Sequence, residues 1–243
     1  MPNPYPPGYV ALERALSKLG LCSRRIAREW IAAGRVRIAG TVVTDPRRAV
    51  IPEAGTISID DAQANAAVPV YIALNKPRGL ITTSADERGR DTVYACFDGA
   101  DLPYVSPVGR LDQASEGLLL FSNDTRWANQ VLDPESGPGK TYHVQVASLA
   151  DDELCASLER GADCDGEHLA VHRAAILRSG ERRSWLELEL HGGRNRHIRR
   201  LLTAHGYEVE RLVRVAIGDL ELGDLDKGQW RHLQPAQVSS LVQ

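Results

Sequence analysis

The sequence of 243 residues lacks the marks of several common protein classes. It has no apolar run close to the about 20 residues that a membrane-spanning helix needs, and its Pro-rich start, MPNPYPPGY, has no hydrophobic signal core. Its four cysteines form no C-x-x-C pair and have no histidine at zinc-ligand spacing. We therefore expect a cytoplasmic protein with reduced thiols, no bound metal and no membrane partner.

Two catalytic signatures are also missing. The string GPGKT, residues 137–141, ends like a phosphate-binding loop, but Pro134 stands where the loop needs its first glycine, and the following YHVQV is typical of a strand. No G-x-S-x-G motif is present. His191 and His197 have no acidic or thiol third member in the pattern, so we expect plain polar roles for them. The sequence therefore argues against a nucleotide-hydrolysing enzyme, a serine hydrolase and a metal centre, and predicts no cofactor.

Charge is unevenly distributed, although the net charge is only −3 at pH 7. Between residues 10 and 50, nine Lys or Arg stand against three Asp or Glu, so this segment carries about +6 and the rest is net acidic. Five of its arginines can converge on one surface: Arg24, Arg25, Arg28, Arg35 and Arg37. Such a surface suits a nucleic-acid backbone, which needs cations. On charge alone, a solvated basic face remains the alternative.

The first 60 residues predict a compact unit of two helices and short strands. Apolar spacing favours a helix over residues 11–19 and a second one that starts at the capping residue Ser23. RVRIAGTVV predicts two brief strands around a tight turn at Ala39, and GTISID predicts another strand. The small, polar stretch 62–69 is predicted to be a linker.

Beyond residue 70 the chain predicts an α+β domain. GLLLFS, KTYHVQVA and SWLELEL are typical of strands, and SWLELEL alternates leucine with polar residues. Helical patterns occur over residues 125–132, 151–160 and about 196–205. Strands and helices at irregular spacing, with antiparallel pairs, favour this class over a regular βαβ repeat.

The aspartate of PVGRLDQASEGLLLFSND, residues 107–124, is the most conspicuous candidate for chemistry. Arg110 and Asp112 are two residues apart, so on an extended backbone their side chains point to one side and can pair. Such a pair would keep the aspartate ionised, and an ionised carboxylate beside an apolar strand is a plausible nucleophile or base. From this motif alone, a structural Arg–Asp pair at a strand end is the more common explanation.

The order of the motifs resembles a known family. ALSKLGLCSRRIAREWIAAGRVRIAGTVV resembles the S4 RNA-binding domain, with Ala39 in place of the usual Asn. Six strings follow in order: LNKPRGLITT, VGRLDQASEGLLLFSND, KTYHVQV, GGRNRHIRRLL, VERLVRVAIG and GQWRHL. Together they resemble the RsuA/RluB-type ribosomal RNA pseudouridine synthases, in which an S4 domain precedes the synthase domain.

Composition predicts a disordered N-terminus at 1–9 and the linker at 62–69. The resemblance implies an S4-type RNA-binding domain at 10–61 and a catalytic domain at 70–243. The catalytic domain would contain a long mixed, largely antiparallel sheet with flanking helices. The implied activity is the isomerisation of one uridine of ribosomal RNA to pseudouridine, with a leaning towards large-subunit 23S rRNA. The enzyme would be a monomer without a cofactor that acts on free ribosomal RNA or a ribosomal precursor particle. The alternative is an RNA-binding assembly factor that has lost catalysis, which requires damage at the reactive positions, and the sequence shows none.

The resemblance also implies roles for individual residues. Asp112 would be the catalytic aspartate, Tyr142 would stack on the target base, and Arg199 would form an ion pair with Asp112. Leu212 would pack on the other side of the base, and Arg110 would help to displace it. The further substrate-binding residues implied are Lys76, Arg194, Asn195, Arg196 and Arg200. RNA contacts of the S4-type domain would come from Arg24, Arg25, Arg28, Arg35 and Arg37.

Three positions depart from the family pattern. His197 replaces the usual Gln, Ser115 the usual Thr, and Thr125 a glycine. None of them is a proposed reactive residue, so we expect them to affect the positioning of the RNA more than the chemistry. These roles fit together physically, because a base has to leave the RNA stack at a cost of about a few kcal/mol, and an aromatic face with an apolar wall recovers part of it.

Overall fold

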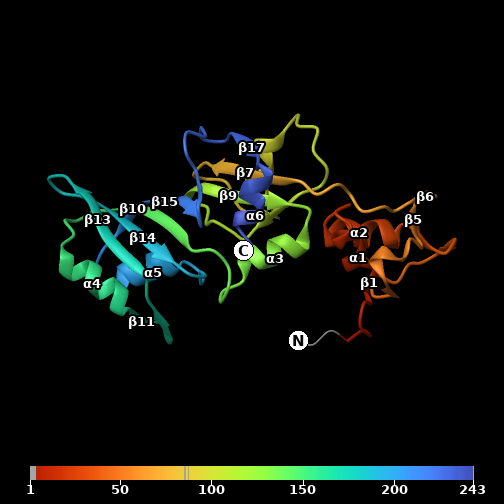
Figure 1. Cartoon of the computed structure of the whole chain (residues 1–243), viewed down its shortest axis with the longest axis horizontal. Coiled ribbons are helices and arrows are strands. Elements are labelled where there is room, and N and C mark those ends of the chain that lie inside the picture. The colour runs from red at the N-terminus through yellow and green to blue at the C-terminus, as the bar shows by residue number, and fades with distance from the viewer. Residues whose placement is uncertain (1–3, 85, 87, 243) are drawn as a thin grey trace. The chain divides into compact units, whose positions relative to one another are not determined.

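The computed structural model describes residues 4–84, 86 and 88–242, and the chain folds into two compact units (Figure 1). The first contains Met1–Tyr71, Gly99–Ser106 and Phe121–Arg126, and the second contains Ile72–Asp98, Pro107–Leu120 and Trp127–Gln243. Among the described residues, no helix has the length and apolar character needed to cross a membrane.

Two short helices begin the first unit. They are α1 (Leu12–Lys18) and α2 (Arg24–Ala32), which confirms the expected helical pair. Ser23 caps α2, because its Oγ accepts a hydrogen bond from the Ile26 amide at 3.2 Å. The apolar faces of the helices share one core with the adjoining strands, and its most buried members are Leu12, Ala15, Leu16, Ala27, Ile31 and Val36.

Small strands complete the first unit. β1 (Val10–Ala11) pairs with β4 (Ala49–Val50), and a four-stranded sheet has the order β3-β2-β5-β6. Its members are β2 (Val36–Ile38), β3 (Thr41–Val42), β5 (Ile57–Ile59) and β6 (Ala62–Gln63), with the 3-10 turn η1 (Pro52–Ala54) before β5. The expected turn between β2 and β3 is confirmed: Ala39 and Gly40 have φ of 47° and 79°, as a two-residue hairpin turn requires.

The structure differs from the sequence-based expectation at both ends of this unit. Ala62, expected in a linker, starts β6 and pairs with Ile59. The reason is a second tight turn, at Asp60 and Asp61, whose φ of 48° and 66° are tolerated by aspartate. Of the N-terminus expected to be disordered, residues 1–3 lie outside the described residues. In residues 4–9, the Tyr5 hydroxyl donates to the Arg47 carbonyl at 2.8 Å.

A mixed sheet organises the second unit. Its strand order is β13-β14-β10-β15-β9-β7-β17, with β8 beside β9 and β16 beside β15. β10, β13, β14 and β15 pair antiparallel, as do β7 and β17, whereas β9 runs parallel to β15. The expected mixed, largely antiparallel sheet is confirmed. The strands are β7 (Tyr71–Lys76), β8 (Ser106–Val108), β9 (Glu116–Ser122), β10 (Lys140–Val146), β13 (Arg173–Ser179), β14 (Ser184–Leu190), β15 (Val209–Ile217), β16 (Leu220–Glu221) and β17 (Trp230–His232).

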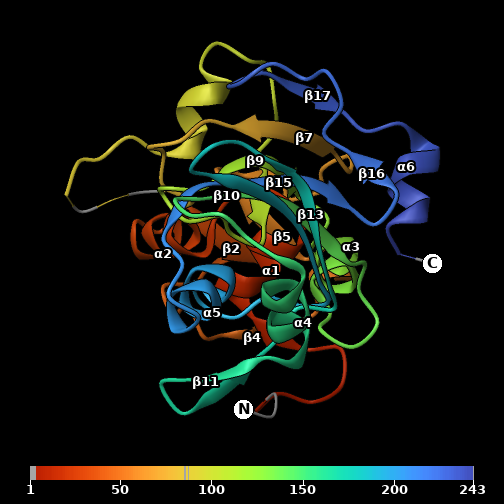
Figure 2. The ribbon, with the colours of Figure 1, turned by 90° about the vertical axis from the view of Figure 1, so that its left-hand side faces the viewer.

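Helices α4 and α5 cover one face of the β13, β14, β10 and β15 region, as Figures 1 and 2 show. The alternation predicted for SWLELEL is confirmed, because Leu186, Leu188 and Leu190 are buried in the core with these helices while Glu187 and Glu189 are half-buried on the opposite face. The remaining elements are α3 (Thr125–Leu132), α4 (Asp152–Arg160), α5 (His197–Ala204), α6 (Pro235–Ser240), the 3-10 turn η2 (Val93–Phe97) and the hairpin β11 (Ala162–Cys164) and β12 (Glu167–Leu169).

Gly117 fixes the place where β9 meets β15. It has a φ of 98° and pairs with Arg214, and an added Cβ atom would lie far inside van der Waals contact with the Arg214 carbonyl oxygen and 2.9 Å from its amide nitrogen. Only glycine fits such a close approach of two backbones. The segment before β9, which contains Asp112, is thereby placed beside Leu212 and Arg214 of β15.

Candidate active site

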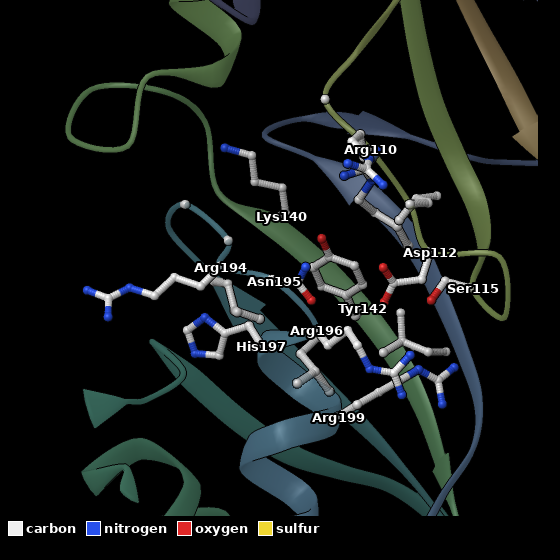
Figure 3. Close-up of a pocket in the computed structure, with 18 of the residues that line it drawn as sticks. Arg110, Asp112, Ser115, Lys140, Tyr142, Arg194, Asn195, Arg196, His197 and Arg199 are labelled. Atoms are coloured by element: carbon white, nitrogen blue, oxygen red, sulfur yellow. The ribbon is translucent and has the colours of Figure 1, made fainter. Parts of the chain in front are cut away.

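A pocket of about 500 Å³ lies between the Asp112 segment, β10, β15 and the loop before α5 (Figure 3). Among the residues that line it are most of those implied for the catalytic unit by the sequence: Arg110, Asp112, Tyr142, Arg194, Asn195, Arg196, Arg199 and Leu212. The structure therefore brings together side chains that are up to about a hundred positions apart in the sequence.

The turn that contains Asp112 is closed by its own backbone. The Ser115 amide donates to the Asp112 carbonyl at 3.0 Å. Before the turn, the Thr82 hydroxyl donates to the Leu111 carbonyl at 2.7 Å and accepts from the Leu111 amide at 3.3 Å. Thr82 is buried, so these bonds form away from solvent. They hold the backbone on the N-terminal side of Asp112.

The C-terminal side of the turn is held by neighbouring segments. The Gly79 amide donates to the Gln113 carbonyl at 2.8 Å, and the Gln113 side chain donates back to the Gly79 carbonyl at 3.0 Å. The Lys76 ammonium, fully buried at the end of β7, donates to the Ser115 carbonyl at 2.8 Å. Burial lowers the pKa of Lys76 to about 8. Asp112 thus sits on a backbone that is fixed independently of any ligand.

Arg199 contacts the turn and not the carboxylate. Its Nη2 donates to the Ala114 carbonyl at 3.1 Å and its Nη1 to the Val209 carbonyl at 3.2 Å. The direct Asp112–Arg199 ion pair implied by the family resemblance is not formed in this structure, in which both Nη atoms donate to these backbone carbonyls instead. Burial and then the neighbouring Arg196 lower the pKa of Arg199, whereas the Asp112 charge acts in the opposite direction.

The carboxylate of Asp112 has no hydrogen bond or ion pair within the part of the chain that the structure describes. Its neighbour Arg110 is exposed and does not pair with it either. In Figure 3 the carboxylate points into the pocket, towards the side on which Tyr142 lies. A half-buried carboxylate on a rigid turn with no partner is available to react with a bound molecule.

Neighbouring strands supply an aromatic and an apolar wall. Tyr142 on β10 lies opposite Arg214 on β15, and Leu212 precedes Arg214 by two residues on the same strand. Leu212 is 5% exposed, and Tyr142 is half-buried. Since both side chains line the pocket that contains Asp112, a planar group can be held between them with one edge near the carboxylate.

Lys140 and Arg214 also line the pocket, although neither was predicted from the sequence to be a site residue. Both are buried, and Arg214 Nε donates to the Leu118 carbonyl at 2.7 Å while its Nη2 has no partner among the described residues. The missed signal is the two-residue period of a strand: Lys140 precedes Tyr142 by two, and Arg214 follows Leu212 by two. The pKa of Lys140 is lowered by burial and then by the Arg214 charge.

Two of the residues implied for substrate binding do not line the pocket. Lys76 has no exposed surface, so direct contact with a large ligand is excluded in this conformation, and it holds the Asp112 turn from behind. Arg200 turns towards the β11–β12 hairpin, where it pairs with Glu167 at 2.7 Å and Asp165 at 3.3 Å. Arg200 points away from the pocket because it follows Arg199 directly on α5, and consecutive residues of a helix point in different directions.

The Glu116 carboxylate stabilises the start of β9. It is buried and pairs with Arg211 at 3.1 Å and with Lys227 at 2.5 Å. Burial alone would raise the pKa of Glu116, but the hydrogen bonds from Arg211 and Lys227 outweigh it, and the pKa is lowered. This cluster ties β9 to β15 on the chain segment that directly follows the Asp112 turn.

In the first unit, the five arginines proposed to bind RNA all have carboxylate partners. The buried Glu13 pairs with Arg24 at 2.6 Å and with Arg28, and the hydrogen bond from Arg28 is the main reason why the pKa of Glu13 is lowered. The other three pair on the surface: Arg25 with Glu29, Arg35 with Asp60, and Arg37 with Asp61. Their side chains remain between 38% and 58% exposed, so they stay accessible to a polyanion.

The arginine-rich segment 10–50 and the carboxylate pocket together indicate an enzyme that acts on RNA. Comparison with known proteins agrees, because residues 70–204 match the RNA pseudouridylate synthase family and residues 12–53 match the S4 domain. The chain belongs to the RNA pseudouridylate synthase family, whose members are isomerases that act on RNA.

Similar proteins extend over almost the whole chain. A Bacillus subtilis protein named ribosomal large subunit pseudouridine synthase B is 35% identical over 233 residues, 95% of this chain and 94% of its own length. An uncharacterised RNA pseudouridine synthase of Mycobacterium tuberculosis is 35% identical over 98% of this chain and 94% of its own length. A crystal structure of a pseudouridylate synthase matches with a TM-score of 0.68 and 26% identity, and covers 96% of this chain and 100% of that one.

Proposed function

We propose that this chain converts one uridine of ribosomal RNA, with a leaning towards large-subunit 23S rRNA, to pseudouridine, and that Asp112 is the catalytic residue. The preference for the large subunit is supported by the name of the Bacillus subtilis relative. The observation that carries the catalytic assignment is the Asp112 carboxylate, which is unpaired among the described residues and lies on a turn held on both sides.

The reaction needs a carboxylate at the ribose. The N1–C1′ bond of the uridine breaks, the uracil turns and rejoins the ribose through C5, and the C5 proton is lost while N1 takes one up. Asp112 acts either by attack at C1′ or by removal of the 2′ proton, and both routes need the carboxylate ionised beside the same sugar. The reaction consumes no co-substrate, because the substrate and the product are isomers.

The walls of the pocket suit a base that has left the RNA stack. In this proposal Tyr142 stacks on the uracil and Leu212 packs on its other side. Unstacking the base costs roughly a few kcal/mol, and these two contacts recover part of that free energy. Arg199 keeps the Asp112 turn in place and presents a buried Nε that has no partner among the described residues. Arg110 is exposed at the rim of the pocket, where it can help to displace the base.

The cations around the pocket would contact the RNA backbone. Arg194 and Arg196, with Asn195 between them, are exposed in the loop before α5. Phosphate groups are bound well by such a cluster, because guanidinium groups form paired hydrogen bonds with their oxygens. The S4-type unit would bind a second segment of the RNA through the five arginines Arg24, Arg25, Arg28, Arg35 and Arg37.

We further propose that the protein works in the cytoplasm as a monomer, on ribosomal RNA that is free or in a precursor particle. The predicted division into residues 1–9, 10–61, 62–69 and 70–243 is part of this proposal, except that Ala62 and Gln63 belong to β6 and the linker begins after them. Sedimentation of the purified protein at several concentrations tests the monomer, and a concentration-dependent dimer contradicts it.

The experiment that tests the function is pseudouridine mapping of both ribosomal RNAs from cells that lack the gene. We expect one pseudouridine to be lost, to return with the wild-type gene, and to stay absent with Asp112→Asn. Restoration of the same pseudouridine by Asp112→Asn would refute the catalytic role. If no pseudouridine is lost from either ribosomal RNA, the proposed substrate is wrong.

RNA binding by the same variant distinguishes an enzyme from an assembly factor. Asparagine has the size of aspartate, and the Asp112 carboxylate has no partner to lose among the described residues, so the variant should fold. The enzyme predicts wild-type affinity for RNA without product. An assembly factor without catalysis predicts that Asp112→Asn and wild type behave alike in every assay.

A further inference from the structure

Three possible metal ligands meet on the face of the sheet opposite α4 and α5. They are His172, just before β13, Glu189 near the end of β14, and His191 just after β14. One ligand atom from each lies within 4.8 Å of the other two. From the sequence we expected a plain polar role for His191, since no acidic third ligand was evident, and the structure supplies Glu189 together with a second imidazole, His172.

The geometry is close to that of a metal centre. Ligand atoms around one tetrahedral Zn²⁺ at 2.0–2.1 Å are about 3.4 Å apart. His191 Nε2 and Glu189 Oε1 are already 3.6 Å apart, and the rings of His172 and His191 are in edge-to-face contact at 4.8 Å between centroids. Small side-chain rotations therefore bring the three atoms to coordination distance.

The backbone fixes two of the three positions. The His172 amide donates to the Glu189 carbonyl at 2.7 Å, which holds the start of β13 against the end of β14. Gly139 leaves room beside the ligands, because an added Cβ atom would lie 3.0 Å from Glu189 Oε1 and 3.4 Å from the His191 ring. The φ of Gly139 is not positive, so its backbone conformation does not require glycine. What favours glycine here is the space that it leaves for the Glu189 and His191 side chains.

The charges leave one carboxylate oxygen available. Arg173 approaches Glu189 Oε2 at 3.9 Å, but its closer partner is Glu187 at 2.5 Å. Oε1 of Glu189 faces His191 instead. Two imidazole nitrogens and one carboxylate oxygen are a ligand set that favours Zn²⁺ and similar divalent transition metals over Mg²⁺ or Ca²⁺, which prefer oxygen ligands alone.

The site is connected to the pocket through the chain. His191 is followed by Gly192 and Gly193, which line the pocket and begin the loop that leads to Arg196 and α5. Gly192 has a φ of 84°. A metal bound to His191 would therefore restrain the first residue of this loop by linking it to β13 and β14.

We propose that His172, Glu189 and His191 form a site for one divalent transition-metal ion of the Zn²⁺ type, separate from the uridine pocket. Three protein ligands leave one position of a tetrahedral ion for a water molecule.

Equilibrium dialysis of the full chain against Zn²⁺ alone tests the site. We expect one equivalent to bind saturably, and the affinity to fall at least about tenfold in His172→Ala and in His191→Ala. Visible absorption of bound Co²⁺ should be lost in the same variants. His168→Ala is the matched control, because His168 is an exposed histidine that pairs with Asp163 outside the cluster, and it should bind as wild type does.

Thermal unfolding provides a second measurement, since a ligand that binds only the folded state raises its stability. Zn²⁺ should raise the midpoint of wild type and His168→Ala and leave that of His191→Ala unchanged. The proposal is wrong if wild type binds no Zn²⁺ saturably, or if binding survives in both His172→Ala and His191→Ala, which would place the ion on other groups such as the thiols. Because no step measures pseudouridine, the result is independent of the proposed function.

Discussion

Replacement of Lys76 by Met should change the pH dependence of stability in a direction set by burial. The Lys76 ammonium is fully buried behind the Asp112 turn, and its pKa falls from 10.5 to about 8. At a pH between 8 and 10.5, Lys76 is protonated in the unfolded chain and largely deprotonated in the folded chain. The free energy of unfolding therefore rises with pH over this range. Methionine is of similar length and carries no charge, so Lys76→Met removes this contribution.

The expected size follows from the shift. One pKa unit corresponds to about 1.4 kcal/mol, so the contribution of Lys76 grows by about 2.5 kcal/mol between pH 7 and pH 10. At pH 7 the two proteins should be similar in stability, because the loss of the bonds from Lys76 to the Ser115 and Pro77 carbonyls, about 1–3 kcal/mol, opposes relief from a buried charge. At pH 10 wild type should be the more stable by about 2–3 kcal/mol.

Urea unfolding of both proteins at intervals from pH 7 to pH 10 measures this difference. Other groups that titrate at high pH are common to both proteins and cancel. These include Tyr71, whose pKa is raised to about 12, and Cys22, whose pKa is raised to about 11, both by burial first. A difference that stays constant over this range refutes the reasoning. As a positioning residue, Lys76 should also affect kcat and leave the affinity for RNA unchanged.

Two more predictions concern glycine and charge. Gly117→Ala should lower the free energy of unfolding by about 2–4 kcal/mol, because the new methyl group meets the Arg214 backbone at a positive φ; a loss below about 0.5 kcal/mol in urea would contradict the close approach. Glu13→Gln should destabilise the protein by about 1–2 kcal/mol at pH 7, since Arg24 and Arg28 lose their shared carboxylate. Because the pKa of Glu13 is lowered, its contribution is present above pH 4.5 and is lost as the pH falls further, so thermal unfolding of wild type and variant should converge in acid.

The fold was largely predictable because its signals are local. Capping by Ser23, the turn at Ala39 and the alternating leucines of SWLELEL depend on neighbours in the sequence, and the structure has each of them. Residues 62–63 were missed because the turn at Asp60 and Asp61 uses aspartate, and not glycine, at positive φ.

The site was predictable in its members and less so in its contacts. Asp112, Tyr142 and Leu212 were named from the motifs and line one pocket. The actual partners of Arg199 are backbone carbonyls, and a motif of side chains contains no information about which carbonyls are near. The meeting of His172 with Glu189 depends on the pairing of β13 with β14, which spacing alone does not determine.

The five arginines proposed to bind RNA in the S4-type domain all pair with carboxylates, and this pairing affects which polyanions the domain can bind. An RNA phosphate that binds Arg35 through its Nε and Nη2 atoms has to displace Asp60, so a paired contact at this edge of the guanidinium is an exchange of one anion for another. Salt weakens both the bond that is formed and the bond that is broken. For single strands, the logarithm of the binding constant usually falls by about 0.7 per phosphate contact for each tenfold increase in salt concentration. The fall for this protein should therefore be shallower. Weakly bound anions are excluded in this way, while an RNA that engages several arginines together overcomes the competition.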